Sequence, residues 1–381
     1  MKRILSLDGG GIRGVFSLQI LKRIEEIFRQ EHGKPELVLR DVFDFFAGTS
    51  TGAIIATFLA WGKSVAEIES VYVDHGKEMF DRAQWYARLK AKYNPETITN
   101  FLQKQFCEED GRPATLGTGK FYASGRNNRS EDELPKTYLL VVMRNASTGS
   151  AWPVNNNPKA KYNLRTHPQC NLDIPLWQLL RASTAAPTFF PPESITLGQD
   201  QDRGTSIFVD GGITPYNNPA LIAALMATLP RYHMNWESGP DKIQLVSVGT
   251  SQARTRLEKE EAERVNLLDQ LTHVVPALLH SVGMGQDLLC RVLGDCVHGE
   301  EIDSEIGDLV GGFGPLAAHE KKFTYVRYNQ TFTAKEVTEA ERATKMPFAL
   351  DNLQLIPHMQ EAGRAYAKNH VRRGHFFPEK A

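Results

Sequence analysis

Three short glycine-containing segments carry the residues best suited to chemistry in this chain. They are residues 8–14 (DGGGIRG), 48–52 (GTSTG) and 210–212 (DGG). Each follows a short apolar run that is typical of a buried strand, and the first two lead into helical patterns. Backbone amides at such junctions can hold an anion, and a serine placed there can serve as a nucleophile. The segments therefore indicate either an anion-binding site or a serine hydrolase.

The second segment fits the G-x-S-x-G pattern, in which flanking glycines permit a strained turn that exposes a serine hydroxyl. Ser50 is the candidate nucleophile, and Gly48 and Gly52 are the glycines of the turn. A serine at the start of a helix is also a common N-cap, which needs no chemistry. The strand before Ser50 and the apolar helix after it favour the nucleophile.

A nucleophilic serine needs a base and a place for the oxyanion. The amides of Gly9, Gly10 and Gly11 could stabilise an oxyanion, and Arg13 beside them could hold a phosphate or carboxylate. Alternatively, Arg13 pairs with a nearby acid or faces solvent. Asp210 ends a predicted strand and is the candidate base, although Asp-Gly alone is an ordinary turn.

The first segment also fits the dinucleotide-binding pattern G-x-G-x-x-G through Gly9, Gly11 and Gly14. That pattern requires an acidic residue at the end of the second strand, where it would bind the ribose. Asp41 and Asp44 instead flank the start of that strand. A nucleotide-binding oxidoreductase therefore stays an alternative with only this loop in its favour.

The elements that must position these residues alternate between strand and helix. We expect strands at residues 3–7, 42–47, 137–143, 207–209, 242–248 and 323–328, and helices at 18–28, 53–61, 219–229, 265–293 and 352–371. Residues 252–264 are highly charged and are typical of a solvated helix face. This order predicts an α/β fold with a central, mostly parallel sheet flanked by helices. No long linker divides the chain, which favours one compact domain.

Composition excludes several classes of protein. The 381 residues carry 44 basic and 45 acidic side chains, a net charge of −1, which argues against a nucleic-acid polymer as partner. The longest apolar run, 53–61, is too short to cross a bilayer, and the N-terminus lacks the apolar core of a signal peptide. The four cysteines, Cys107, Cys170, Cys290 and Cys296, fit neither a disulfide framework nor a zinc motif. We expect a cytoplasmic protein without metal or cofactor.

Taken together, these motifs resemble the patatin-like phospholipases. The resemblance rests on the order and spacing of residues 8–14, 48–52, 185–192, 210–212 and 217–219, and extends over roughly residues 2–330. It implies a patatin-like three-layer fold with a catalytic domain at 1–335 and a helical extension at 336–381 packed on it. Position by position, it implies that Ser50 and Asp210 form a catalytic dyad. It also implies an oxyanion hole of Gly9, Gly10 and Gly11, with Arg13 beside it.

The implied chemistry is attack of Ser50 on a lipid ester, an acyl-enzyme, and hydrolysis by water. An aspartate with its ordinary pKa of about 3.9 is a weak base, so burial would have to raise the pKa of Asp210. Two alternatives remain. One is a Ser-Asp-His triad that uses His273, His280 or His319, and the other is a non-catalytic storage or interaction protein on the same scaffold.

The resemblance also implies partners. The substrate would be membrane phospholipid, reached by transient contact at the inner membrane. Trp85, Tyr86 and Tyr93 alternate with basic residues (Arg88, Lys90 and Lys92), which fits an interfacial patch or an ordinary amphipathic helix. Some bacterial members of the family are similarly compact and serve as antiviral effectors, so the resemblance also implies a cyclic oligonucleotide activator. An oligomer is compatible with the sequence.

Overall fold

A large sheet forms the centre of the protein. The computed structural model describes residues 1–76, 95–127, 130, 132–187, 189–198, 204–253, 281–303, 305–311, 316–346, 348–349 and 351–377. Within these residues the sheet has the order β5-β6-β3-β2-β1-β7-β10-β9, and β4 pairs with β3. Its strands are β1 (Lys2–Leu7), β2 (Phe45–Thr49), β3 (Tyr138–Asn145), β4 (Ala151–Asn155), β5 (Glu193–Thr196), β6 (Thr205–Asp210), β7 (Ile243–Val248), β9 (Asp295–His298) and β10 (Thr324–Tyr328). A small second sheet pairs β8 (Gln252–Ala253) with β11 (Thr331–Phe332).

Six neighbouring strands, β3, β2, β1, β7, β10 and β9, are parallel, whereas β4, β5 and β6 are antiparallel to their partners. The helices include α1 (Gly14–His32), α2 (Thr51–Trp61), α3 (Val65–Asp74), α5 (Pro95–Gln105), α6 (Leu176–Ser183), α8 (Ala220–Thr228), α11 (Ala334–Thr344) and α12 (Ile356–His370). The predicted α/β class with a mostly parallel sheet is confirmed.

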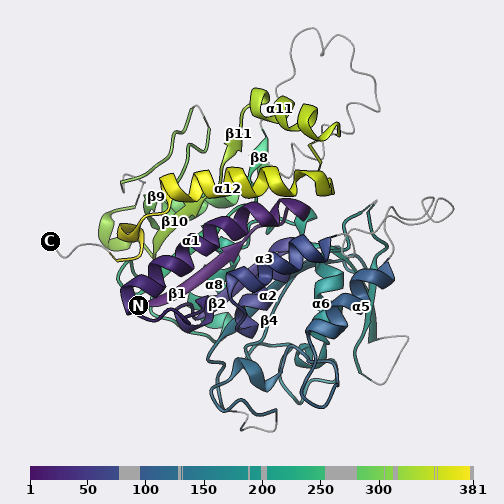
Figure 1. Ribbon diagram of the computed structural model, residues 1–381. Coiled ribbons are helices and arrows are strands. Elements are labelled where there is room, and N and C mark those ends of the chain that lie inside the picture. The colour runs from purple at the N-terminus through teal and green to yellow at the C-terminus, as the bar shows by residue number, and fades with distance from the viewer. Residues whose placement is uncertain are drawn as a thin grey trace.

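Both faces of the sheet are covered, which gives three layers. Leu5, Phe46 and Val246 belong to the hydrophobic core beneath α1 and α2. Their chain neighbours Ile4, Phe45 and Leu245 belong to a second core beneath α8. This alternation follows from the two-residue period of a strand. In Figure 1, α1, α2, α3 and α12 lie together on one face of the sheet.

The C-terminal helix α12 packs along α1, as Figure 1 shows. The approach is close at Gly363, where an added Cβ would lie 2.8 Å from the Cγ atom of Gln19. Glu69 of α3 joins the two helices, since its Oε1 atom accepts hydrogen bonds from the side-chain amides of Gln19 and Gln360. The helix that begins at the first glycine segment is therefore held from both sides.

Most predicted elements lie close to their expected positions, with two corrections. The second strand was predicted at 42–47 but is Phe45–Thr49, because the amides of Val42 and Phe43 bond to the carbonyl of Leu39 in a turn. Of the solvated helix face predicted at 252–264, residues 252–253 instead form β8, and 254–264 lie outside the described residues. Of the predicted helix at 265–293, residues 281–293 are described and are helical, and 265–280 lie outside the described residues.

Two further sequence expectations concern membranes and thiols. Among the helices of the described residues, none combines the length and apolar character that a membrane span requires. The proposed interfacial residues Trp85, Tyr86, Arg88, Lys90, Lys92 and Tyr93 lie outside the described residues. All four cysteines are free, and three of them are buried.

Candidate active site

The nucleophile candidate lies where β2 turns into α2. Ser50 has a backbone φ of 53°, a left-handed value that is uncommon for a residue with a side chain. The turn is tight, because a Cβ on Gly48 would lie 2.2 Å from the Gly52 carbonyl oxygen. A Cβ on Gly52 would lie 2.3 Å from the Leu7 carbonyl oxygen. The two glycines are therefore required by close backbone contact, and the strained serine is typical of a nucleophile turn.

Helix α6 supports this turn from the side. The backbone N–H of Ser50 donates a 2.9 Å hydrogen bond to the Ser183 hydroxyl, and that hydroxyl donates a 2.6 Å bond to the Val142 carbonyl of β3. Ser183 is the last residue of α6 and is fully buried. The sequence analysis did not single it out, since a lone serine at a helix end carries no signal of its own.

The aspartate reaches the serine through the antiparallel strand β6. This strand overlaps β3 by only three residues, with Asp210 paired to Met143 and Phe208 paired to Asn145. Its carboxyl end therefore reaches the same part of the sheet as the end of β2, where Thr49 pairs with Val142. The Ser50 hydroxyl donates a 2.7 Å hydrogen bond to the Oδ2 atom of Asp210. The two predicted residues, 160 positions apart, are in direct contact.

Burial makes this carboxylate more basic than an exposed one. Asp210 is 5% exposed, and its Oδ1 atom accepts a 2.6 Å hydrogen bond from the Gly212 amide. Burial raises the pKa of Asp210 to about 6, and the hydrogen bonds from Gly212 and Ser50 only partly oppose that rise. A raised pKa is what Asp210 needs in order to act as a base.

Histidines contribute nothing to this pair within the part of the chain that the structure describes. His319 is exposed in the short turn Ala318–Glu320 and makes no hydrogen bond to either residue of the pair. His273 and His280, the other two candidates for a triad, lie outside the described residues. The described geometry is therefore that of a serine and an aspartate in direct contact.

The first glycine segment lies beside the serine, because β1 pairs with β2 and Leu7 is opposite Gly48. A Cβ on Gly9 would lie 3.3 Å from the Ser50 Cβ. The Gly9 amide donates to the Asn217 carbonyl, and the Thr250 hydroxyl donates to the Gly9 carbonyl. The amides of Gly10 and Gly11 make no hydrogen bond within the described residues. Both amides can therefore donate hydrogen bonds to a ligand.

Arg13 lies one turn further on, at the start of α1. Its Nε atom is buried without a hydrogen-bond partner, and no acid of the described residues forms an ion pair with its guanidinium. Burial lowers the pKa of Arg13 to about 10, so it still carries a positive charge at neutral pH. The alternative given in the sequence analysis, an ion pair between Arg13 and a nearby acid, is not seen in the described part of the chain. A partly buried cation without an ion pair in the described residues, close in the chain to two free amides, suits an anionic ligand.

A buried ion pair fixes the start of the glycine segment. Arg327 of β10 donates to Asp8 at 2.9 Å and 2.6 Å through its two terminal nitrogens. One of these nitrogens also donates a 2.7 Å bond to the Ser247 hydroxyl of β7. Burial alone would lower the pKa of Arg327, but the facing carboxylate raises it above its ordinary value. Burial also raises the pKa of Asp8, and the charge of Arg327 and its hydrogen bonds oppose that rise. The two-bond geometry is that of a guanidinium–carboxylate ion pair. The sequence analysis missed Arg327, because nothing local distinguishes an arginine in a strand.

Comparisons with known proteins agree with the motifs. A sequence model described as patatin-like phospholipase matches residues 5–224. An intracellular phospholipase A2 of Caenorhabditis elegans is 33% identical over 257 residues, which cover 65% of this chain and 19% of that protein. A cGAMP-activated phospholipase of Escherichia coli is 30% identical over 250 residues, which cover 65% of this chain and 62% of that protein.

A second cGAMP-activated phospholipase, from Vibrio cholerae, is 32% identical over 222 residues, which cover 58% of this chain and 56% of that protein. The chain thus spans less than two thirds of the length of each of these relatives. The matched range contains Ser50, Asp210 and the glycine segment, whereas Arg327 lies beyond it.

The buried ion pair yields a stability prediction. Arg327→Met leaves the Asp8 carboxylate buried without its counter-charge, and we expect the free energy of unfolding to fall by about 3–5 kcal/mol. Urea unfolding followed by circular dichroism measures the loss. Arg373→Met is the matched control, because it removes a similar two-bond pair with Glu31 that is largely exposed. An equal loss in both variants would contradict the role of the buried pair.

Proposed function

Because this chain belongs to the patatin-like phospholipase family, we propose that it is a lipid acyl hydrolase that releases fatty acids from membrane glycerolipids. The observation that carries the proposal is the 2.7 Å hydrogen bond from the strained Ser50 to the buried Asp210. A turn that only began a helix would need neither the left-handed serine nor a carboxylate on its hydroxyl. Both are what an activated nucleophile requires.

The contacts support a two-step mechanism. Asp210 accepts the hydroxyl proton while the Ser50 Oγ atom attacks the ester carbonyl, and the amides of Gly10 and Gly11 stabilise the oxyanion. When the tetrahedral intermediate collapses, the C–O bond of the ester breaks and the proton passes to the departing lipid alkoxide. Water then attacks the acyl-serine, with Asp210 taking its proton and returning one to Ser50. Donors held in place before the reaction supply much of the rate enhancement in such sites.

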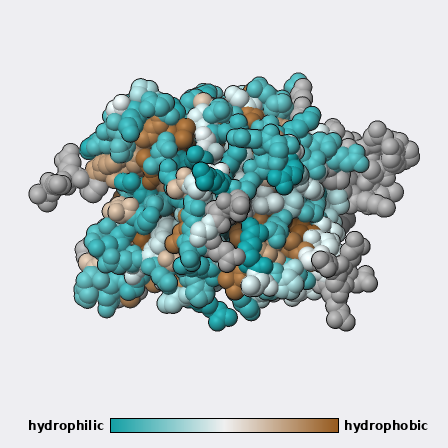
Figure 2. Space-filling model, turned by 90° about the horizontal axis from the view of Figure 1, so that it is seen from below, coloured by the Kyte–Doolittle hydropathy of each residue, from teal (hydrophilic) through white to brown (hydrophobic). Residues whose placement is uncertain are grey.

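Two features support a phospholipid as the substrate. The unpaired Arg13 lies beside the free amides of Gly10 and Gly11, where the phosphate of a bound lipid could meet its charge. Ile213, three residues after Asp210, is 41% exposed. Figure 2 shows hydrophobic side chains gathered in separate patches on one mainly hydrophilic face. With a net charge of −1, local apolar contact would have to contribute more to membrane docking than overall charge.

Regulation by a cyclic oligonucleotide is part of this proposal. Two relatives, from Escherichia coli and Vibrio cholerae, are named cGAMP-activated phospholipases. By that similarity, the present chain would be an effector that degrades the cell membrane once a cyclic dinucleotide binds it. Transient contact with the inner membrane would then follow activation.

The dyad yields the first prediction for this function. Ser50→Ala and Asp210→Asn should each lower fatty-acid release from phosphatidylcholine vesicles by at least about a thousandfold, since residues that act as a unit fail together. A fluorophosphonate probe should label the wild-type protein and leave Ser50→Ala unlabelled. His273→Ala, His280→Ala and His319→Ala are the controls and should keep most of the activity. A loss in any histidine variant as complete as that in Ser50→Ala would favour a triad.

The pH dependence yields the second prediction. Only the deprotonated Asp210 can accept a proton, and its pKa is raised to about 6. Therefore kcat/KM should be constant above that pH and should fall about tenfold per unit below it. The profile is measured on a soluble ester, with circular dichroism at each pH to exclude unfolding. An inflection near the ordinary pKa of an exposed aspartate would contradict the burial argument.

The role of Arg13 yields the third prediction. Arg13→Met should lower kcat/KM for a phospholipid by about tenfold or more, because a charge-assisted bond to phosphate is lost. Hydrolysis of an uncharged ester of similar chain length should change much less. Equal losses on both substrates would assign Arg13 to the architecture of the glycine loop instead of to the phosphate.

Activation yields the fourth prediction. Adding cGAMP to the purified full chain should stimulate fatty-acid release from vesicles by at least about tenfold, a coupling within the usual allosteric range. Linear dinucleotides of the same bases are the control. No stimulation by any cyclic dinucleotide would remove this regulation from the proposal, and basal hydrolysis would be unaffected by that outcome.

A further inference from the structure

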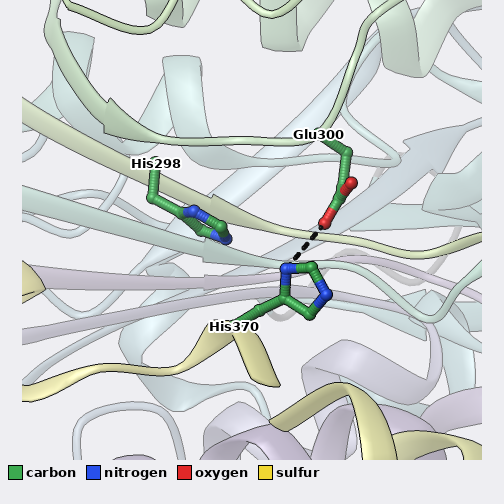
Figure 3. A group of neighbouring side chains, drawn as sticks. All are labelled: His298, Glu300 and His370. Atoms are coloured by element: carbon green, nitrogen blue, oxygen red, sulfur yellow. Dashed lines mark ion pairs between the residues drawn. The ribbon is translucent and has the colours of Figure 1, made fainter.

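A group of metal-ligating side chains lies far from the serine in the sequence, at the end of β9. His298 is the last residue of β9, Glu300 follows two positions later, and His370 ends α12. One donor atom from each of the three lies within 4.8 Å of the other two. In Figure 3 all three side chains point toward one another from separate parts of the chain.

The separations suit a shared cation. The Nδ1 atom of His370 is 3.2 Å from the Oε1 atom of Glu300. Ligand atoms about 2.0–2.2 Å from a tetrahedral zinc ion lie roughly 3.5 Å from each other. The Nε2 atom of His298 is buried and has no hydrogen-bond partner. The His298 ring points toward the space between the other two side chains (Figure 3). This nitrogen is shielded from water and has no hydrogen bond to replace that contact. Such burial costs free energy unless a ligand binds the nitrogen.

Neighbouring groups hold the three residues in place. The Tyr366 hydroxyl donates a 3.1 Å hydrogen bond to Glu300, and the Tyr366 ring stacks on His370 with centroids 4.4 Å apart. The ring of His375 stacks on His298 at 4.7 Å and is itself bonded to the Tyr328 hydroxyl. Support of this kind orients metal ligands in known sites.

The surroundings favour a cation and leave it accessible. Glu300 and His370 line a cavity of about 720 Å³. Four further glutamates line the same cavity: Glu301, Glu336, Glu339 and Glu361. Their summed negative charge attracts cations and disfavours an anionic ligand. The cavity also leaves room for a water molecule or another ligand at a fourth coordination position.

We propose that His298, Glu300 and His370 bind a divalent transition-metal ion of the zinc class, which links the end of β9 to the end of α12. Two imidazoles and one carboxylate are a donor set that zinc accepts with a fourth position open. The same set is unsuited to calcium and magnesium, which prefer oxygen ligands. The sequence analysis predicted no metal site, because it searched for paired cysteines, whereas these ligands are up to 72 positions apart in the chain.

Calorimetric titration of the chelator-treated full chain with ZnCl2 at neutral pH tests this assignment. We expect saturable binding of one equivalent and a rise in the unfolding temperature with zinc. Magnesium should produce neither effect. His298→Ala, Glu300→Gln and His370→Ala should each weaken zinc binding at least tenfold. His358→Ala is the matched control, since His358 lines the same cavity outside the group of three, and it should bind as the wild type does.

Two results would overturn the assignment. One is the absence of saturable binding, which would make the group an ordinary ion pair with a buried histidine beside it. The other is binding that the three substitutions leave unchanged. Glu300→Gln keeps an oxygen that can accept the Tyr366 hydrogen bond, so this variant should fold and decide the question if His298→Ala does not. Ser50→Ala should retain zinc binding, which makes this test independent of the proposed hydrolase function.

Discussion

The buried ion pair between Asp8 and Arg327 is the interaction on which the arrangement of the candidate active site depends. It spans three strands, because β7 lies between β1 and β10 and its Ser247 also bonds to Arg327. The Ser247 hydroxyl in turn donates a hydrogen bond to the side chain of Asn218. The backbone carbonyl of Asn217 accepts a hydrogen bond from the Gly9 amide. One polar network thus holds the glycine segment and the segment after Asp210. Because its members are buried, each must keep its partner, and the backbone around them has little freedom.

This rigidity explains how the Ser50 hydroxyl and the Asp210 carboxylate come into direct contact. The hydroxyl and the carboxylate meet because the parallel strands set the position of Ser50, and a three-residue antiparallel overlap sets that of Asp210. Gly211 allows that approach, since a Cβ there would lie 2.3 Å from the Val142 carbonyl oxygen. Exclusion of water then raises the pKa of the carboxylate, and the same burial strengthens any amide hydrogen bond to an oxyanion. Geometry and basicity therefore have one origin, the close packing of three glycine-containing turns.

The sequence predicted the parts of the site that depend on local pattern. The strand–glycine–helix order located β1, α1 and the Ser50 turn, whereas β2 was placed three residues early because an apolar run does not show where a turn ends. That Ser50 and Asp210 meet was implied only by resemblance, since spacing along the chain carries no distance. Ser183 and Arg327 were missed for the same reason. Their partners lie 133 and 319 positions away, and contacts at that range are decided by the topology of the sheet.

The same topology bears on the proposed metal site. The strands from β2 to β9 are parallel, so His298 at the end of β9 lies at the same edge of the sheet as Ser50. The two residues are four strands apart, which is roughly 19 Å at the usual strand spacing. Contacts run between the two places: His298 stacks on His375, which bonds to Tyr328, and the residue before it on β10 is Arg327. A continuous series of contacts is not in itself an energetic coupling between the two sites. Coupling exists only where binding at one site changes the binding free energy at the other. The strand β10 is the element that both places share, so a coupling between them would have to act through its position against β7.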